Sequence, residues 1–367
     1  MDELQTKIPY ERINLLLPQQ RSKYSDLYNV YNDLFLGLKK IGIESEIILI
    51  NFGREYSDFP YFNVKKINMD NLKEIIYSKN DFFVTVDDFK LMYYFFRNDI
   101  KSYNILIWAH YFYGHKFIFE RYKKLWNDNF GIPFIYKLLD YIPLNLMMRN
   151  ARFYYTPLKN NKTVAQSIWT DLLLERVYNI STQGLLYIPV EYDYYNTGKV
   201  EKINRALIFL GGREDSDLFA LKKTVDILKE IDRDLEFDYF GDEEIGEYFN
   251  KKFNENIVYL GKLERKELSM EYAKHLLTIS PVYNGNFEMV PIQSLLCGTP
   301  VITYIQPFME VTGQSVLIAN ISNSSEMKRK FKMWQNNLYD ELNIIKKRIL
   351  SVMDNKAVAM ELMNYLL

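Results

Sequence analysis

The stretch that most constrains the fold is residues 283–304, which read YNGNFEMVPIQSLLCGTPVITY. It begins with a polar, glycine-containing loop and reaches Pro291, which suits the first turn of a helix because its missing N–H would be unpaired there. Gly298 fits the end of this helix, Pro300 prevents its continuation, and the apolar residues 301–304 predict a buried strand. A loop that feeds a helix N-terminus offers free amides and the positive end of the helix dipole, so this segment suits a phosphate.

The same alternation of strands and helices occurs in the first half of the chain. Apolar runs at 13–17 and 47–50 flank residues 27–41, where apolar side chains recur at helical spacing. Strand–helix–strand order predicts a parallel sheet with crossover helices. Residues 81–86 and 104–108 predict two further strands.

In the second half, a strand at 206–210 is followed by Gly211, Gly212 and Arg213, and then by a helix that Asp215 or Ser216 can cap. Strand, glycine turn and helix N-terminus together form the general layout of a phosphate site.

Residues 283–304 resemble the donor-nucleotide loop of the retaining GT-B-type glycosyltransferases, above all glycosyltransferase family 4. That family has a glutamate, Gly-Phe-Gly, a second glutamate and then Ala/Cys-Gly-Thr-Pro-Val-Ile. The tail CGTPVI is matched residue for residue. The glutamates are not matched, because the second falls on Gln293 and the first on Gly285, and Glu288 stands where the family usually has glycine.

This resemblance implies the α/β GT-B architecture, in which two Rossmann-like parallel-sheet domains face a cleft. We expect an acceptor-side domain at 1–192, a donor-nucleotide domain at 193–340, and a helix at 341–367 that packs back on the first domain. Residues 151–156 resemble the family's late N-domain strand, and 186–190 its closing strand-and-proline element.

The resemblance also implies which residues form the site. The family places an arginine and, a turn later, a lysine at the donor diphosphate; Arg213 matches, whereas the lysine position falls near Leu218. Lys222 either reaches back to the diphosphate or belongs to a solvated helix face, and we favour the solvated face. The donor-binding positions implied are Gly211, Gly212, Arg213, Asn286, Phe287, Met289, Val290 and Gln293.

His110 lies just past a central strand, where open α/β sheets place their ligands. Family members often carry a histidine here that faces the donor sugar, so His110, Glu288 and Arg213 are the catalytic candidates. The alternatives are a structural histidine at 110 and a loop carboxylate at 288 that backbone amides satisfy. His275 falls in an apolar helical stretch and is expected to be structural.

No metal or cofactor is expected. Asp232 and Asp234 have the spacing of a metal-binding DxD motif, but they lie in a predicted turn, where polar residues are common. HExxH, CxxC and P-loop patterns are absent from the sequence.

The 46 Lys and Arg residues nearly balance the 47 Asp and Glu residues, so we expect no nucleic-acid partner. One cysteine and no apolar N-terminal core indicate a reducing, cytoplasmic location. Residues 117–150 mix aromatic, leucine and basic residues. They suit either a peripheral contact with the inner membrane face or ordinary core helices, and we favour core helices.

The function implied is a metal-independent retaining glycosyltransferase that moves a sugar from a nucleotide-sugar donor to a glycan, lipid-linked or protein acceptor. Three departures from the family, in the first glycine loop, the lysine and the glutamate pair, keep open a catalytically silent subunit that binds a partner glycosyltransferase or glycan. A sugar-nucleotide epimerase of the same fold is a further alternative.

Overall fold

The computed structural model forms two compact units, residues 1–189 with 355–367 and residues 190–354. The structure describes residues 10–20, 26–51, 58–77, 80–110, 152–211, 216–283, 287–304, 306–335 and 340–366. Arg213, Gly212 and Asn286 lie outside these ranges.

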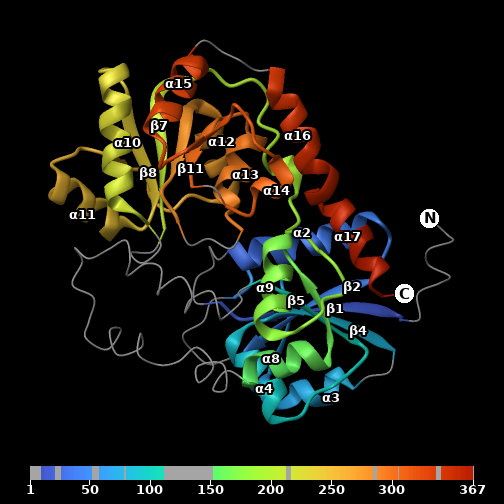
Figure 1. Cartoon of the computed structure of the whole chain (residues 1–367). Coiled ribbons are helices and arrows are strands. Elements are labelled where there is room, and N and C mark those ends of the chain that lie inside the picture. Colours follow the sequence, from blue (N-terminus) through green and yellow to red (C-terminus); the bar gives the residue numbers. More distant parts are fainter. Residues whose placement is uncertain are drawn as a thin grey trace, which may run out of the picture. The chain divides into compact units, whose positions relative to one another are not determined.

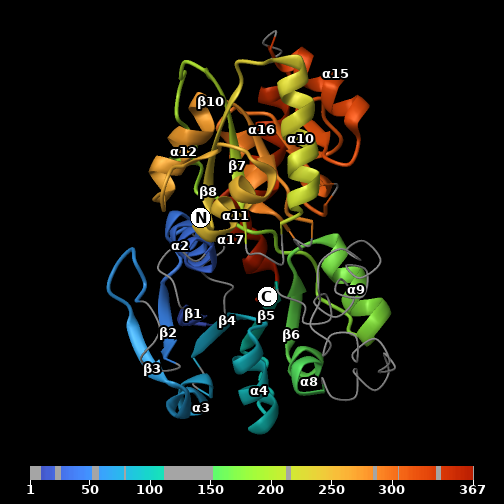
Figure 2. The same ribbon diagram turned by 90° about the vertical axis from the view of Figure 1, so that its left-hand side faces the viewer.

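The first unit is built on a six-stranded parallel sheet in the order β3-β2-β1-β4-β5-β6, which Figure 2 shows from β3 to β6. Its strands are β1 (Arg12–Pro18), β2 (Ser45–Asn51), β3 (Lys65–Asn68), β4 (Asp81–Val86), β5 (Ile105–Ala109) and β6 (Lys162–Ala165). The central strands are apolar on both faces, as a sheet covered by helices on both sides requires.

The helices of the first unit are α2 (Asp26–Lys40), α3 (Leu72–Ile76), α4 (Phe89–Arg97), α8 (Arg152–Asn160), α9 (Ile168–Tyr178) and α17 (Asn355–Asn364). Helix α17 packs on α2, and α4 packs on α8. At the first contact the backbones nearly touch, because a Cβ added to Gly37 would lie 2.0 Å from the carbonyl oxygen of Asn355.

The prediction of a strand at 151–156 is wrong, because residues 152–160 form α8. Tyr154 and Leu158, one helical turn apart, bury their side chains in the core that this helix shares with α4. The aromatic residues of this stretch suit either structure, and tertiary packing selects the helix.

The second unit repeats the plan with the parallel order β12-β11-β10-β7-β8-β9. Its strands are β7 (Ile203–Leu210), β8 (Glu236–Gly241), β9 (Val258–Tyr259), β10 (His275–Ser280), β11 (Val301–Thr303) and β12 (Ile318–Asn320). Its helices are α10 (Leu218–Ile231), α11 (Glu243–Phe253), α12 (Arg265–Lys274), α13 (Met289–Leu296), α14 (Met309–Thr312), α15 (Ser324–Gln335) and α16 (Asp340–Met353). Figure 1 shows α10 and α11 on one side of this sheet and α12 and α13 on the other.

The helix and the strand predicted within residues 283–304 are confirmed. Helix α13 includes Pro291 in its first turn, and Gly298 follows it with a φ of +86°. Strand β11 then pairs with β10. Two helices end the chain. Helix α16 packs on α13 and α14 within the second unit, whereas α17 packs in the first unit.

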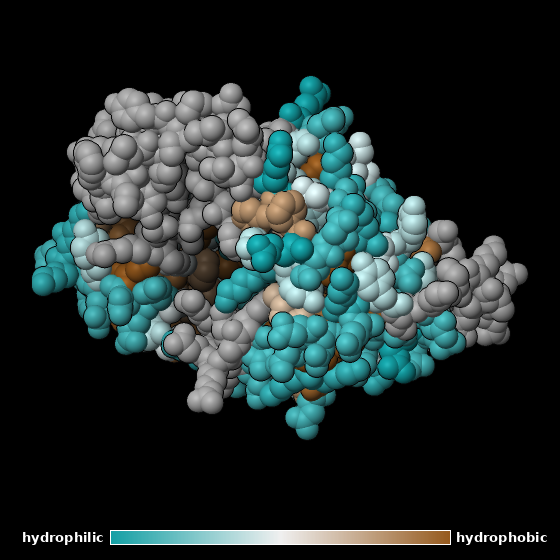
Figure 3. Space-filling view, turned by 90° about the horizontal axis from the view of Figure 1, so that it is seen from below, coloured by the Kyte–Doolittle hydropathy of each residue, from teal (hydrophilic) through white to brown (hydrophobic). Residues whose placement is uncertain are grey.

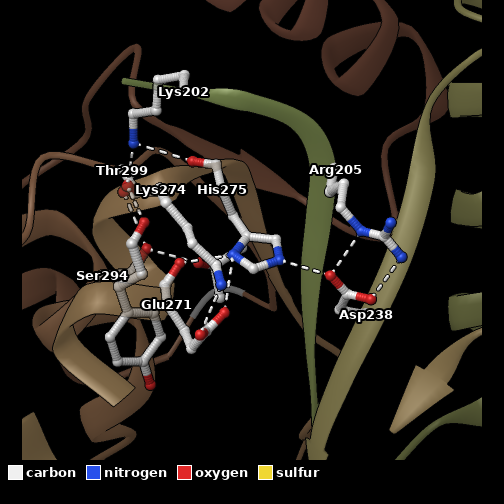
Figure 4. Close-up of polar contacts among 10 residues, drawn as sticks. Lys202, Arg205, Asp238, Glu271, Lys274, His275, Ser294 and Thr299 are labelled. Carbon is white, nitrogen blue, oxygen red and sulfur yellow. Dashed lines mark hydrogen bonds and ion pairs between the residues drawn. The ribbon is translucent and has the colours of Figure 1, made fainter. Parts of the chain in front are cut away.

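A buried polar network ties the amino ends of β7, β8 and β10 together (Figure 4). His275 is fully buried at the start of β10, not within a helix, and its Nε2 lies 3.0 Å from Asp238 Oδ2. Arg205 donates to both oxygens of Asp238, at 2.6 and 2.7 Å. This network lies at the opposite edge of the sheet from the strand ends where ligands are expected, so we assign it a structural role.

The described residues seen from below in Figure 3 are mostly hydrophilic, with hydrophobic residues in scattered patches. Among the helices that the structure describes, none is both long and apolar enough to cross a membrane.

Candidate functional site

The strand order of the second unit reverses between β7 and β10, and the crevice outside the carboxyl ends of such strands is where open α/β sheets bind ligands. Two loops leave this point: residues 211–217 after β7 and residues 281–288 after β10. They are the two loops in which the sequence predicts phosphate contacts. The topology therefore brings both predicted loops to one edge of one sheet.

The two loops touch. Ser216 and Val282 form an isolated antiparallel bridge, and the backbone N–H of Asp217 donates to the carbonyl of Pro281 at 2.9 Å. A Cβ added to Gly211 would lie 3.4 Å from Val282 Cγ2, so the start of the first loop also packs on the second.

The cap of α10 differs from the prediction. Asp217 is the N-cap residue, rather than Asp215 or Ser216, and its Oδ1 accepts from the N–H groups of Phe219 and Ala220 at 3.1 and 2.9 Å. The chain's own carboxylate thus takes two of the amides that the prediction left for a phosphate.

Glu288 is the N-cap of α13, and its Oε1 accepts from the N–H of Val290 at 3.4 Å. This geometry agrees with the alternative in which backbone amides satisfy the loop carboxylate. A role for Glu288 in sugar binding or proton transfer stays a prediction.

The remaining donor-binding candidates that the structure describes lie on or beside the first turns of α13. Phe287 and Val290 are buried, and Met289 is partly exposed. Gln293 is also partly exposed, and its Oε1 accepts from the hydroxyl of Tyr272 on α12 at 3.3 Å. Sequence reasoning assigned Tyr272 no role, because contact between two helices is not visible in local spacing.

Lys222 points toward carboxylates. Its Nζ bonds Asp226 one turn along α10 and lies 3.4 Å from Glu255. This agrees with the interpretation of Lys222 as part of the helix face rather than as a ligand of the diphosphate.

In the first unit, polar residues follow four neighbouring strands at their carboxyl ends: Gln19, Asp87, His110 and Gln166, after β1, β4, β5 and β6. The carboxylate of Asp87 accepts from the backbone N–H of His110 at 2.7 Å and from the hydroxyl of Tyr154. Gln166 Nε2 donates to the carbonyl of His110 at 2.9 Å. The backbone at His110 is therefore held from both sides.

Asp87 was missed by the sequence analysis. The signal that could have found it is the one used for His110, a polar residue directly after a buried strand.

The His110 imidazole is buried edge-on against Trp108, with ring centroids 4.2 Å apart. Burial lowers the pKa of His110 to about 3. The ring is therefore neutral near pH 7, and it can offer a neutral N–H or accept a hydrogen bond but cannot act there as a cationic acid.

We expect this burial to make the first unit sensitive to acid. The folded-state pKa of His110 lies below its unfolded value, so below about pH 6.5 the unfolded chain binds a proton that the folded chain does not. The free energy of unfolding should fall by at most about 1.4 kcal/mol per pH unit from this group as the pH drops from 6 to 4.

Urea unfolding of the wild type and of His110→Gln across this pH range measures the effect. The difference between the two proteins should change with pH. Parallel curves would show that His110 titrates normally.

Within the described ranges, His, Cys, Asp and Glu side chains do not form groups of three or more that could hold a metal ion.

No family model matches the sequence, and no curated protein matches it. Solved structures do match. A sucrose-phosphate synthase from Thermosynechococcus elongatus aligns with a TM-score of 0.69 at 12% identity, covering 96% of this chain and 98% of that one. The lipopolysaccharide outer core galactosyltransferase WaaB aligns with a TM-score of 0.63 at 10% identity, covering 97% and 99%. An α-glucosyltransferase in complex with UDP and DNA aligns with a TM-score of 0.60 at 10% identity, covering 97% and 99%.

These matches extend over almost the whole length of both chains, so both sheets of this chain are included in the alignments. They show that the chain has the GT-B fold, with two parallel-sheet α/β units. The predicted fold class is confirmed.

Proposed function

We propose that this chain is a glycosyltransferase that uses a nucleotide sugar as donor and transfers the sugar to a glycan, lipid-linked or protein acceptor. The observation that carries the proposal is the meeting of two loops, 211–217 and 281–288, at the switch point of the second sheet. The aligned structures add support, because they include a galactosyltransferase and an α-glucosyltransferase in complex with UDP.

In this proposal the second unit binds the donor diphosphate. Departure of a nucleoside diphosphate builds negative charge on the leaving oxygen, and fixed donors aimed at that charge lower the barrier because they interact more strongly with the transition state than with the substrate. We assign this role to Arg213 and to the dipoles of α10 and α13. With this cation in place, the proposal needs no metal ion.

We further propose that transfer occurs with retention, the acceptor attacking from the face of the leaving group. The anomeric carbon becomes oxocarbenium-like, as it does in glycosidases. The first unit serves the acceptor in this proposal. His110, neutral at pH 7, would contribute a hydrogen bond to the reacting sugar rather than a charge.

Gln293 replaces the glutamate that normally accepts hydrogen bonds from the ribose. Because the Tyr272 hydroxyl donates to Gln293 Oε1, we assign Nε2 to the ribose, as a donor. The exchange of a charged acceptor for a neutral amide costs about 1–2 kcal/mol of donor binding.

A second candidate is the catalytically silent subunit that binds a partner glycosyltransferase or glycan. Three observations favour it: Lys222 is paired with acidic residues, Asp217 takes amides at the start of α10, and Gln293 stands at a glutamate position.

Titration of the purified chain with UDP, GDP and ADP, followed by incubation with the matching sugar nucleotides, separates these functions. A transferase binds one nucleoside diphosphate and releases it from its sugar nucleotide, slowly without acceptor and faster with one. A silent subunit binds none and co-purifies with another glycosyltransferase. An epimerase converts the sugar nucleotide in the absence of any acceptor.

A further inference from the structure

Tyr304, the residue directly after β11, reaches across to the loop that follows β7. Its hydroxyl donates to Oδ2 of Asp217 at 2.7 Å. Burial and the bond to Asp217 raise the pKa of Tyr304, so the phenol keeps its proton and acts as a donor throughout the physiological range.

Asp217 is where several parts of the predicted donor site meet. Its other oxygen, Oδ1, caps α10 through Phe219 and Ala220, and its backbone N–H donates to Pro281 in the loop after β10. Both oxygens of one carboxylate are thereby committed, one to a helix and one to Tyr304.

Gln306 makes a second link from the same exit of β11. This buried side chain donates through Nε2 to the carbonyl of Val282, and Val282 bridges to Ser216. The chain leaving β11 therefore holds the loop after β7 through Tyr304 and the loop after β10 through Gln306. All these contacts lie within the second unit.

The charge of Asp217 makes its position important. A carboxylate at the N-terminus of α10 stands at the end of the loop that follows β7, where the proposed function places an anionic diphosphate. Held between the α10 amides and the phenol, the carboxylate accepts three hydrogen bonds. Without the phenol, Oδ2 loses a charge-assisted hydrogen bond, and the negative charge is less fixed and less screened next to the ligand.

We propose that Tyr304 is a positioning residue for the donor site: it fixes the Asp217 carboxylate so that the two loops of the second unit accept a nucleoside diphosphate. This inference rests on the proposed function and adds a residue that acts on the ligand only through Asp217.

Tyr304→Phe keeps the ring and removes the hydroxyl. We expect the Kd for the nucleoside diphosphate that the wild type binds, measured by calorimetry, to rise about tenfold, the size expected for one hydrogen bond to a charged group. The turnover number at saturating donor should change less than twofold, because the hydrogen bond acts on ground state and transition state alike.

Tyr365→Phe is the matched control. Its hydroxyl lies 2.8 Å from the Glu361 carboxylate, and it belongs to the first unit. This variant loses a phenol–carboxylate contact of similar length and should bind the nucleotide as the wild type does.

A double-mutant cycle with Asp217→Asn tests the route of the effect. Asparagine caps helices as well as aspartate does but carries no charge, so Tyr304→Phe should change the Kd less than twofold in the Asp217→Asn background. Wild-type affinity in Tyr304→Phe, or an equal loss in both backgrounds, would overturn the inference while leaving the proposed function intact. If the wild type itself binds no nucleoside diphosphate, the proposed function fails, and this inference fails with it.

Discussion

Replacement of Gly241 by alanine should destabilise the second unit by about 3 kcal/mol or more, because the added methyl group meets backbone. Gly241 ends β8 with a φ of +107°, a conformation that side chains rarely adopt, and a Cβ built there lies 2.1 Å from the carbonyl oxygen of Leu210. That oxygen accepts from the N–H of Asp242 at 2.9 Å. The chain must therefore move at the carboxyl end of β7, next to Gly211.

Gly261→Ala provides the matched control. Gly261 also has a positive φ, +87°, but nothing lies within 4 Å of an added Cβ. It should cost only the conformational penalty of roughly 1–2 kcal/mol. Thermal unfolding followed by circular dichroism should show a Tm lower by about 6–12 °C for Gly241→Ala and by no more than about two thirds of that for Gly261→Ala. Equal shifts in Tm would mean that the contact between the added methyl group and Leu210 does not destabilise the protein.

Removal of the Arg213 guanidinium should weaken nucleoside diphosphate binding by about 1.5–3 kcal/mol, or roughly 10- to 150-fold. The prediction follows from the proposed role of Arg213, since hydrogen bonds from arginine to phosphate oxygens are charge-assisted and often bidentate. Calorimetric titration of Arg213→Ala against the wild type measures it.

Arg233→Ala controls for the loss of one positive charge from the second unit. Arg233 is exposed in the turn between α10 and β8, at the amino edge of the sheet. Its removal should leave the Kd within about twofold of the wild-type value, because exposed charges more than a Debye length of about 10 Å away are largely screened. Equal losses in the two variants would show that net charge, and not a contact made by Arg213, governs binding.

The parts of the fold that local signals determine were predictable. Buried strands such as 13–17 and 81–86 are mostly apolar, and the glycine at 298 has the positive φ that a helix end requires. These signals act within a few residues of one another. The α/β class and the parallel sheets follow from them.

Features that depend on distant partners were not predictable. Asp217 rather than Asp215 or Ser216 caps α10, and the contacts that single it out come from Pro281 and Tyr304, far along the chain. The expected strand at 186–190 is reduced to a single isolated bridge, which joins Val190 to Asp354. The sequence around Asp217 and Val190 does not reveal these distant partners.

The candidate site shows the same division. The two loops could be predicted because a glycine turn and a Pro-initiated helix are local patterns. The hydrogen-bond acceptors of the helix amides beside these loops could not be predicted. In the sequence, Asp217 and Glu288 look like ordinary polar loop residues, and only the structure shows that they cap α10 and α13. His110 was found from its place after β5, whereas the reason for its low pKa, burial against Trp108, appears only in three dimensions.

The central claim is that the switch point between β7 and β10 binds a nucleoside diphosphate, and a crystal structure of the chain soaked with UDP, GDP and ADP tests it most directly. We predict that one of these ligands is ordered with its diphosphate between residues 211–217 and 281–288, within hydrogen-bond distance of Arg213. A diphosphate bound at another place in the second unit would contradict the claim. So would the absence of any bound nucleotide in crystals soaked at concentrations that saturate glycosyltransferases.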